Sequence, residues 1–183
     1  CKEWCFVAPK IIESPSKWER IFPEKDSINY VIAIPGKSKR RFSALMTDVI
    51  QDYDMEQHAN SFPLYIYEKE VIKDNGQMSM FGNTEPKTVK WNRRYALSDV
   101  ILHKYRELYG NKVTKEDIFY YVYAVLQAPA YIDKYSDDLS KDVTRIPTLA
   151  HFAQYVQIGR ALAELHLNYE KPVNAEELGI MVE

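Results

Sequence analysis

The stretch TKEDIFYYVYAVLQAP, residues 114–129, decides the fold of the second half of the chain. Thr114 can cap a helix by accepting a hydrogen bond from the first turn, and the acids that follow it favour the positive end of the helix dipole. Pro129 ends this helix or begins the next, because proline is not tolerated inside a helix. The apolar residues between these signals recur at the spacing of one helical face: Ile118, Tyr121, Val122, Val125 and Leu126.

Three further helices are predicted, one before this helix and two after it. Residues 97–108 precede Gly110, which is suited to a C-terminal cap, and carry their apolar residues at helical spacing: Leu97, Val100, Ile101, Tyr105 and Leu108. A second helix is expected from about 130 to 139. A last, long helix over roughly 149–167 has an apolar stripe that consists of Phe152, Tyr155, Val156, Gly159, Leu162, Ala163 and Leu165.

The first half of the chain predicts strands. Residues 4–7, 30–34 and 45–49 are short runs of β-forming or apolar residues. The run FPLYIY, residues 62–67, is bulky at nearly every position, which predicts a central strand of a sheet that is covered on both sides. Residues 73–90 contain Asn-Gly and Gly-Asn turn signals, so we expect a long loop or an irregular hairpin there.

Together these signals predict a mixed α+β fold over residues 1–183, taken as one domain. A strand- and loop-rich part with a small sheet occupies residues 1–90, and three to four packed helices occupy residues 91–183. Hydrophobic residues make up 46% of the chain and charged residues 27%, as in ordinary globular proteins. No run approaches the ~18 apolar residues of a membrane helix, so we expect a soluble, cytoplasmic chain with no membrane partner. It begins at Cys1 rather than Met, as a piece of a larger multidomain protein would.

No catalytic motif is apparent in the sequence. It lacks a phosphate-binding loop, a G-x-G-x-x-G motif, a G-x-S-x-G nucleophile elbow and the [DNS]-P-P-[YFW] tetrapeptide of amino-methyltransferases. The acids at 48–56 lack the lysine partner of a metal-dependent nuclease. Cys1 and Cys5 lack further ligands at the spacing of a zinc site, so we favour free thiols over a metal site or a disulfide. We therefore expect no catalytic residue, no metal and no cofactor in this chain.

Tyrosine is abundant, with 14 copies. Tyr120, Tyr121 and Tyr123 could stack on bases, but tyrosines at helical spacing are more often core residues whose hydroxyls find a partner, and we favour that interpretation. We likewise interpret His166 as a packed or capping histidine rather than a catalytic base.

The charge is unevenly distributed along the chain. The net charge is −2, unlike that of most DNA-binding domains, yet residues 1–108 hold 17 basic against 15 acidic residues, and residues 109–183 hold 7 against 11. The basic half contains two clusters. The first consists of Lys37, Lys39, Arg40 and Arg41. The second consists of Lys87, Lys90, Arg93 and Arg94. Trp91 and Asn92 in the second cluster add groups suited to base contacts, although a solvated loop is the alternative for both clusters.

Five segments in order carry a resemblance to a known family. They are FSALMTD at 42–48, FPLYIYE at 62–68, EDIFYYVY at 116–123, RIP at 145–147 and GRALAELHLNYE at 159–170. Together they resemble the C-terminal specificity domain of type ISP restriction–modification enzymes, over roughly residues 30–170. These enzymes are single chains that join a nuclease, a helicase-like ATPase, an adenine methyltransferase and a target recognition domain.

The resemblance implies a module that recognises a specific double-stranded DNA sequence for the methyltransferase and helicase-like domains of a parent enzyme. The parent would use S-adenosylmethionine, ATP and Mg²⁺, none of them held by this chain. Because the matching segments are largely apolar, base-reading residues are expected in the loops between them, where both basic clusters lie. A protein-docking module without DNA contact is the alternative, and an independent nuclease is a third possibility.

Overall fold

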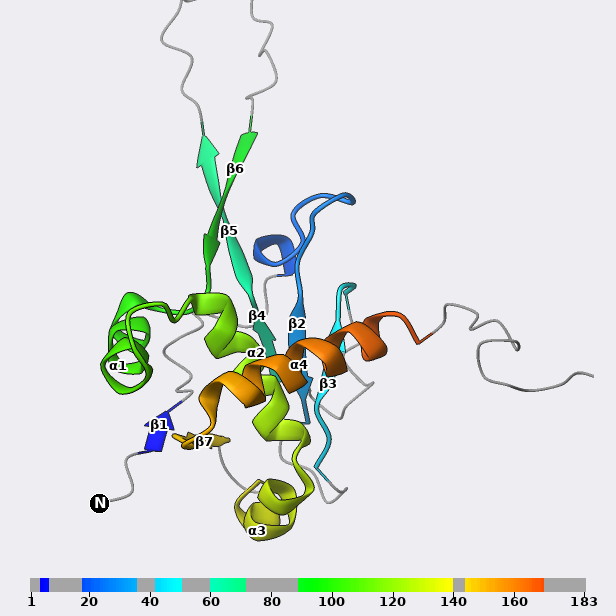
Figure 1. The fold of residues 1–183 in the computed structure, drawn as a ribbon. Helices are drawn as coiled ribbons and strands as arrows, with labels where there is room; N and C mark the ends of the chain where they lie inside the picture. Colours follow the sequence, from blue (N-terminus) through cyan, green and yellow to red (C-terminus); the bar gives the residue numbers. More distant parts are fainter. Residues whose placement is uncertain are drawn as a thin grey trace, which may run out of the picture.

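The computed structural model describes residues 4–6, 18–35, 42–50, 60–71, 89–139 and 144–169. The strands are β1 (Trp4–Phe6), β2 (Val31–Ile34), β3 (Leu45–Thr47), β4 (Asn60–Pro63), β5 (Tyr65–Val71), β6 (Val89–Tyr95) and β7 (Arg145–Pro147). The helices are the 3₁₀ turn η2 (Trp18–Arg20) and the α-helices α1 (Asp99–Tyr109), α2 (Lys115–Gln127), α3 (Pro129–Leu139) and α4 (Phe152–Leu167). This order confirms the predicted α+β class (Figure 1).

The described strands form three small antiparallel sheets. The order β3-β2-β4 places β2 at the centre of the three-stranded sheet, and all four of its residues are buried. The prediction of one central strand over residues 62–67 is therefore wrong. The chain passes from one sheet to the next at Leu64, whose N–H donates to the Tyr30 carbonyl while its own carbonyl accepts from Ala96. The run is bulky throughout because it serves two sheets in succession.

The other two sheets are two-stranded and join distant parts of the sequence. β1 pairs with β7, which connects the start of the chain to the helical half. β5 pairs with β6 over seven residues in continuous register, from Tyr65 opposite Tyr95 to Val71 opposite Val89. The expected loop or irregular hairpin at 73–90 thus ends in a regular strand at residue 89, and its residues 73–88 lie outside the described part.

Helix α2 is the centre of the helical half. Its predicted start is confirmed by a capping box, in which Thr114 Oγ1 accepts from the Asp117 N–H and the Asp117 carboxylate accepts from the Thr114 N–H. More than one face of α2 is buried, because the three-stranded sheet covers one side of the helix and α4 crosses it on another (Figure 1). Gly159 makes this crossing close: a Cβ there would lie 2.0 Å from the Tyr120 carbonyl oxygen.

The apolar stripes of α1 and α4 are only partly covered by the described residues. Tyr105 of α1 is buried, but Val100 is 77% exposed and Leu108 48% exposed. On α4 the buried positions are Phe152, Val156, Gly159 and Ala163. Leu165 is 66% exposed, so its assignment to the buried stripe was wrong. Helical spacing predicts which face of a helix can be buried, but the buried fraction of that face depends on the neighbouring elements.

Of the three tyrosines that were interpreted as core residues, Tyr121 and Tyr123 are buried and their hydroxyls have partners, whereas Tyr120 is half-buried with Arg160 over its ring. Tyr121 is fully buried; its hydroxyl donates to the Pro147 carbonyl at 2.5 Å and accepts from the Leu149 N–H at 3.0 Å. The Tyr123 hydroxyl accepts from the Met46 N–H at 3.1 Å and contacts Nδ1 of His166. This contact confirms that His166 packs against the core.

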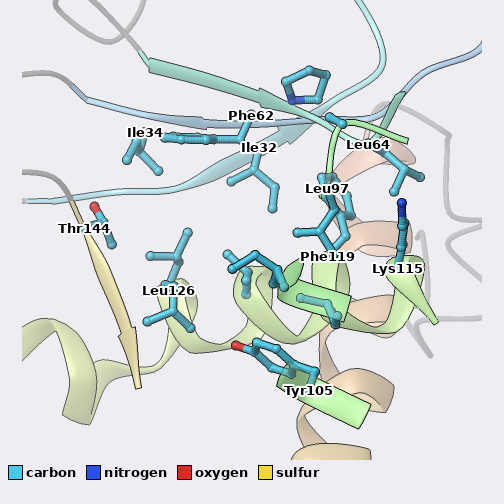
Figure 2. Close-up of a pocket in the computed structure, with 16 residues that line it drawn as sticks. Ile32, Ile34, Phe62, Leu64, Leu97, Tyr105, Lys115, Phe119, Leu126 and Thr144 are labelled. Carbon is cyan, nitrogen blue, oxygen red and sulfur yellow. The ribbon is translucent and has the colours of Figure 1, made fainter. Parts of the chain in front are cut away.

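An apolar cavity of about 70 Å³ lies between the central sheet and α2. Figure 2 shows Ile32 and Leu64 on the sheet side and Phe119 and Leu126 on the helix side. The lining residues are apolar except for Lys115, Thr144 and Tyr105. A cavity of this kind lacks the converging polar groups by which a cofactor site orients its ligand.

Candidate nucleic-acid interface

The structure describes three of the eight predicted DNA-binding residues. Lys90, Arg93 and Arg94 all lie on β6, the second strand of the β5–β6 hairpin. The other five lie outside the described residues: Lys37, Lys39, Arg40, Arg41 and Lys87. Figure 1 shows β5 and β6 extending away from the helices as a two-stranded ribbon. The ribbon is therefore the part of the candidate site whose geometry can be described.

A buried asparagine holds the base of the ribbon. Asn29 is 1% exposed, and its Nδ2 donates to the carbonyls of Ile21 at 2.9 Å and Tyr65 at 2.8 Å. Its Oδ1 accepts from the Tyr65 N–H at 3.0 Å. Both backbone groups of Tyr65 thus bond the loop before β2 rather than β6. The Tyr67 hydroxyl adds a bond to the Ile28 carbonyl at 3.0 Å.

This anchoring determines which side chains approach each other across the ribbon. Because both polar groups of Tyr65 point away from β6, the pair Tyr65–Tyr95 is a non-hydrogen-bonded pair, and every second pair along the ribbon is of the same kind. Side chains of such pairs lie closer together than those of hydrogen-bonded pairs. We call the side of the ribbon that carries them the aromatic face; its described pairs are Tyr65–Tyr95, Tyr67–Arg93 and Lys69–Trp91.

The opposite side, here the ion-pair face, carries the remaining described pairs: Ile66–Arg94, Glu68–Asn92 and Glu70–Lys90. Nε of Arg94 donates to Oε1 of Glu68 at 2.6 Å, and a guanidinium nitrogen of Arg20, on η2, lies 3.9 Å from the same oxygen. Asn92 donates to the Glu70 carboxylate at 2.7 Å. Lys90 stands directly opposite Glu70 in the register. On this face, carboxylates accompany the cations.

On the aromatic face the cations lie over rings. The Arg93 guanidinium carbon lies 4.4 Å from the centre of the Tyr65 ring, and Lys69 Nζ lies 5.9 Å from the centre of the Trp91 ring. Within the described part of the chain, Lys69 and Arg93 have no carboxylate at ion-pair distance. A guanidinium that stacks through its flat face keeps its edge N–H groups available for hydrogen bonds.

The base of the aromatic face is fixed by Glu116 of α2. Its Oε1 accepts from the hydroxyls of Tyr65 at 2.9 Å and Tyr95 at 3.1 Å, and the two rings lie 4.9 Å apart. Burial, followed by the hydrogen bond to Glu116, raises the pKa of Tyr65 above its ordinary value. Tyr65 is therefore protonated at neutral pH, as its donation to a carboxylate requires.

A second polar cluster lies at the start of α2, apart from the ribbon. Arg160 of α4 donates to Oδ1 of Asp117 at 2.9 Å and stacks on the Tyr120 ring at 4.5 Å. Burial alone would raise the pKa of Asp117, but the hydrogen bonds from Thr114 and Arg160 outweigh it and lower the pKa. Asp117 is thus a charged helix-capping group that ties α4 to α2.

Neither a metal site nor a membrane span was found in the part of the chain that the structure describes. No group of three or more His, Cys, Asp or Glu side chains is placed to hold a metal ion within residues 4–6, 18–35, 42–50, 60–71, 89–139 and 144–169. Over the same ranges, no helix has the length and hydrophobicity to cross a membrane.

Lys69 and Tyr65 of the aromatic face were not predicted from the sequence, whereas Trp91 lies within the predicted basic cluster and Tyr95 directly after it. The signal was present in YIYEKEV and VKWNRRY, residues 65–71 and 89–95, once both are taken as strands, because alternate residues of a strand share a face. The basic cluster 87–94 was treated as one unit, whereas the strand places Arg93 and Arg94 on opposite faces.

Comparisons with known proteins identify relatives over nearly the whole chain. Residues 1–180 match the sequence profile of a family described as the type ISP C-terminal specificity domain. No curated protein matched. Among solved structures, the DrdV–DNA complex shares 30% identity at a TM-score of 0.68, over 85% of this chain and 14% of that one.

Two further solved structures resemble the chain to a similar degree. The ATP-dependent type ISP restriction–modification enzyme LlaBIII bound to DNA shares 27% identity at a TM-score of 0.68, over 91% of this chain and 10% of that one. A nuclease-deletion mutant of the type ISP restriction–modification enzyme LlaGI, in complex with a DNA substrate mimic, shares 31% identity at a TM-score of 0.61, over 85% of this chain and 10% of that one. The chain thus spans only 10–14% of the three solved chains.

Proposed function

Because the chain belongs to the family of type ISP C-terminal specificity domains, we propose that it recognises a specific double-stranded DNA sequence on behalf of a larger restriction–modification enzyme. One observation of the structure carries the proposal: a two-stranded ribbon stands out from the core and bears Lys90, Arg93 and Arg94. The major groove of B-DNA is wide enough for such a ribbon, and β-ribbons are an established means of contacting base edges. The three relatives were all solved with DNA or a DNA mimic, which supports the same function.

In this proposal the chemistry belongs to other domains of the parent protein. The chain itself supplies no catalytic group; it places the target site before an adenine methyltransferase and an ATP-driven helicase-like motor with a nuclease. S-adenosylmethionine, ATP and Mg²⁺ would bind those domains, and the enzyme would act in the cytoplasm. Lys37, Lys39, Arg40, Arg41 and Lys87 remain proposed DNA contacts. Of the three residues on β6, Arg93 is proposed as a contact, whereas Lys90 and Arg94 lie on the face that carries Glu70 and Glu68.

The test is duplex binding by the full-length protein across a salt series. We expect tighter binding to a cognate than to a random duplex, and a linear fall of log K with log salt whose slope decreases by about 0.9 for each phosphate contact removed. Changing the four basic residues of either cluster, 37–41 or 87–94, to Ser should weaken binding. The control change of Lys104 on α1 and Lys134 on α3 to Ser should not. Equal binding to cognate and random duplexes would contradict sequence recognition.

The alternative of a docking module has one observation in its favour. Val100 of α1 and Ile158 and Leu165 of α4 are large apolar side chains that are more than half exposed. Exposed apolar side chains on a domain of a larger protein are available for contacts with a neighbouring domain. Changing these three residues to Ser should leave DNA binding intact if they only dock, and the measurement above therefore separates the two functions.

A further inference from the structure

The two faces of the ribbon are chemically different, and we infer that the ribbon contacts DNA through its aromatic face, with Lys69 and Arg93 as the DNA ligands on it and Trp91 between them. Arg94, on the ion-pair face, is then a positioning residue that stabilises the ribbon. The inference rests on the proposed function and names the surface and the residues that perform it, Lys69 among them, which no sequence motif had indicated.

The first argument is the availability of hydrogen-bond donors. Arg94 already uses Nε for Glu68 at 2.6 Å and directs a terminal nitrogen at the Tyr95 carbonyl, 3.5 Å away. The Arg93 guanidinium lies over the Tyr65 ring, and within the described residues its N–H groups have no acceptor. A bidentate contact with guanine O6 and N7, or with a phosphate, needs two adjacent N–H groups of that edge. Arg93 can offer either edge of its guanidinium. Arg94 has its Nε edge occupied by Glu68 and keeps only the terminal edge, one nitrogen of which already points at the Tyr95 carbonyl.

The second argument is charge. The three described pairs of the aromatic face carry two cations, Lys69 and Arg93, and no carboxylate. The three described pairs of the ion-pair face carry two cations and two carboxylates, Glu68 and Glu70. Beyond the base of the ribbon, where Glu116 bonds the tyrosines, a phosphate backbone is attracted to the first surface. On the second, Arg94 and Arg20 lie against Glu68, and Lys90 stands opposite Glu70. Bringing DNA against Glu68 and Glu70 would add repulsion between like charges.

The third argument is access. Near its base the ion-pair face is approached by η2, whose Arg20 reaches Glu68. The outer part of the aromatic face presents Lys69 over Trp91, with Lys69 and Arg93 exposed. Stacking limits the positions that both cations can take, which reduces the conformational entropy lost when DNA binds. The Trp91 ring beside them offers an apolar surface of the kind that contacts thymine methyl groups.

The test compares matched variants of the full-length protein. Arg93→Gln and Arg94→Gln each remove one arginine from neighbouring positions of the same strand. Lys69→Gln on β5 and Lys90→Gln on β6 each remove one lysine, and the two lie on opposite faces of the ribbon. We expect Arg93→Gln to weaken cognate binding by about 5- to 150-fold if it contacts a guanine, or to lower the salt slope by about 0.9 if it contacts a phosphate. Lys69→Gln should lower the slope by about 0.9 as well.

The ion-pair face should behave differently. Arg94→Gln and Lys90→Gln should leave both the salt slope and the base preference as in the parent, and Arg94→Gln should lower the melting temperature. Double replacement of Glu68 and Arg94 by Gln keeps the net charge and should also leave DNA binding unchanged. Melting curves for every variant exclude loss of binding through unfolding.

The outcomes separate the inference from the function on which it rests. If Arg94→Gln or Lys90→Gln lowers the slope or the base preference as much as Arg93→Gln and Lys69→Gln do, the assignment of the faces is overturned while sequence recognition stands. If the parent protein shows no preference for its cognate duplex, the proposed function itself fails.

Discussion

At the scale of single residues, Asn29 is the position on which the ribbon most depends. Replacing Asn29 with Ala removes the partner of four buried or half-buried backbone groups: the carbonyl of Ile21, the N–H of Tyr30 and both polar groups of Tyr65. Each such group costs about 1–3 kcal/mol when it is unsatisfied. We expect Asn29→Ala to lower the free energy of unfolding by on the order of 3 kcal/mol, measured by denaturant titration.

The matched control is Asn92→Ala on β6. Asn92 is exposed and makes one side-chain bond to Glu70. Because water can replace that bond, we expect a loss below about 1 kcal/mol. An Asn29→Ala variant as stable as Asn92→Ala would show that the Asn29 bonds do not anchor the ribbon.

At the scale of elements, the close crossing of α2 and α4 requires glycine at position 159. Alanine at 159 would place its Cβ 2.0 Å from the carbonyl oxygen of Tyr120, a backbone atom that cannot move without shifting α2. We expect Gly159→Ala to destabilise the protein by about 1–3 kcal/mol or more, despite alanine's better helix propensity. The opposite change at an exposed position of the same helix, Ala161→Gly, should cost only about 0.5–1 kcal/mol. Thermal or denaturant melts of the two variants give the comparison, and a Gly159→Ala variant more stable than the parent would contradict the packing.

The elements also show what the sequence could predict. The start of α2 and the end of α1 depend on local signals, the Thr114–Asp117 capping box and Gly110 at φ +101°, and both were predicted. β6 was missed because its side chains, Lys90 to Arg94, show no apolar alternation. Their neighbours are residues such as Glu68, 26 positions before Arg94, which no local pattern reveals. For the same reason the basic cluster was found, but not its division into two faces.

At the scale of the whole molecule, buried tyrosines connect the sheets to the helices. The Tyr131 hydroxyl donates to the Arg145 carbonyl at 2.6 Å, and the Tyr121 hydroxyl donates to the Pro147 carbonyl. Burial is the main cause that raises the pKa of these tyrosines, and it raises the pKa of Tyr123 to about 12. In the unfolded chain a tyrosine has a pKa of about 10.

Stability should therefore fall in alkaline solution. A folded-state pKa above the unfolded value means that the protonated hydroxyls stabilise the fold fully below pH 10, and that this contribution is lost as the pH rises from about 10 through 12. We expect the free energy of unfolding to be constant between pH 8 and about 9.5 and to decrease steeply at higher pH. Denaturant titration measures this free energy, and tyrosinate absorbance reports the ionisation of the hydroxyls. Tyr121→Phe should make the decrease shallower. A free energy of unfolding that stays constant to pH 12 would contradict the role of these hydroxyls.

The attachment of the ribbon through the main chain of Tyr65 bears on how such a domain acquires a new target. Asn29 bonds the peptide groups of residue 65 and no side chain farther out, so the direction of the hairpin does not depend on what occupies positions 69, 91 and 93. Drift in natural populations, or a library built by a protein engineer, can exchange those three side chains while the scaffold keeps its shape. If positions 69, 91 and 93 contact DNA as proposed, target preference and foldability are encoded in separate positions of one short segment.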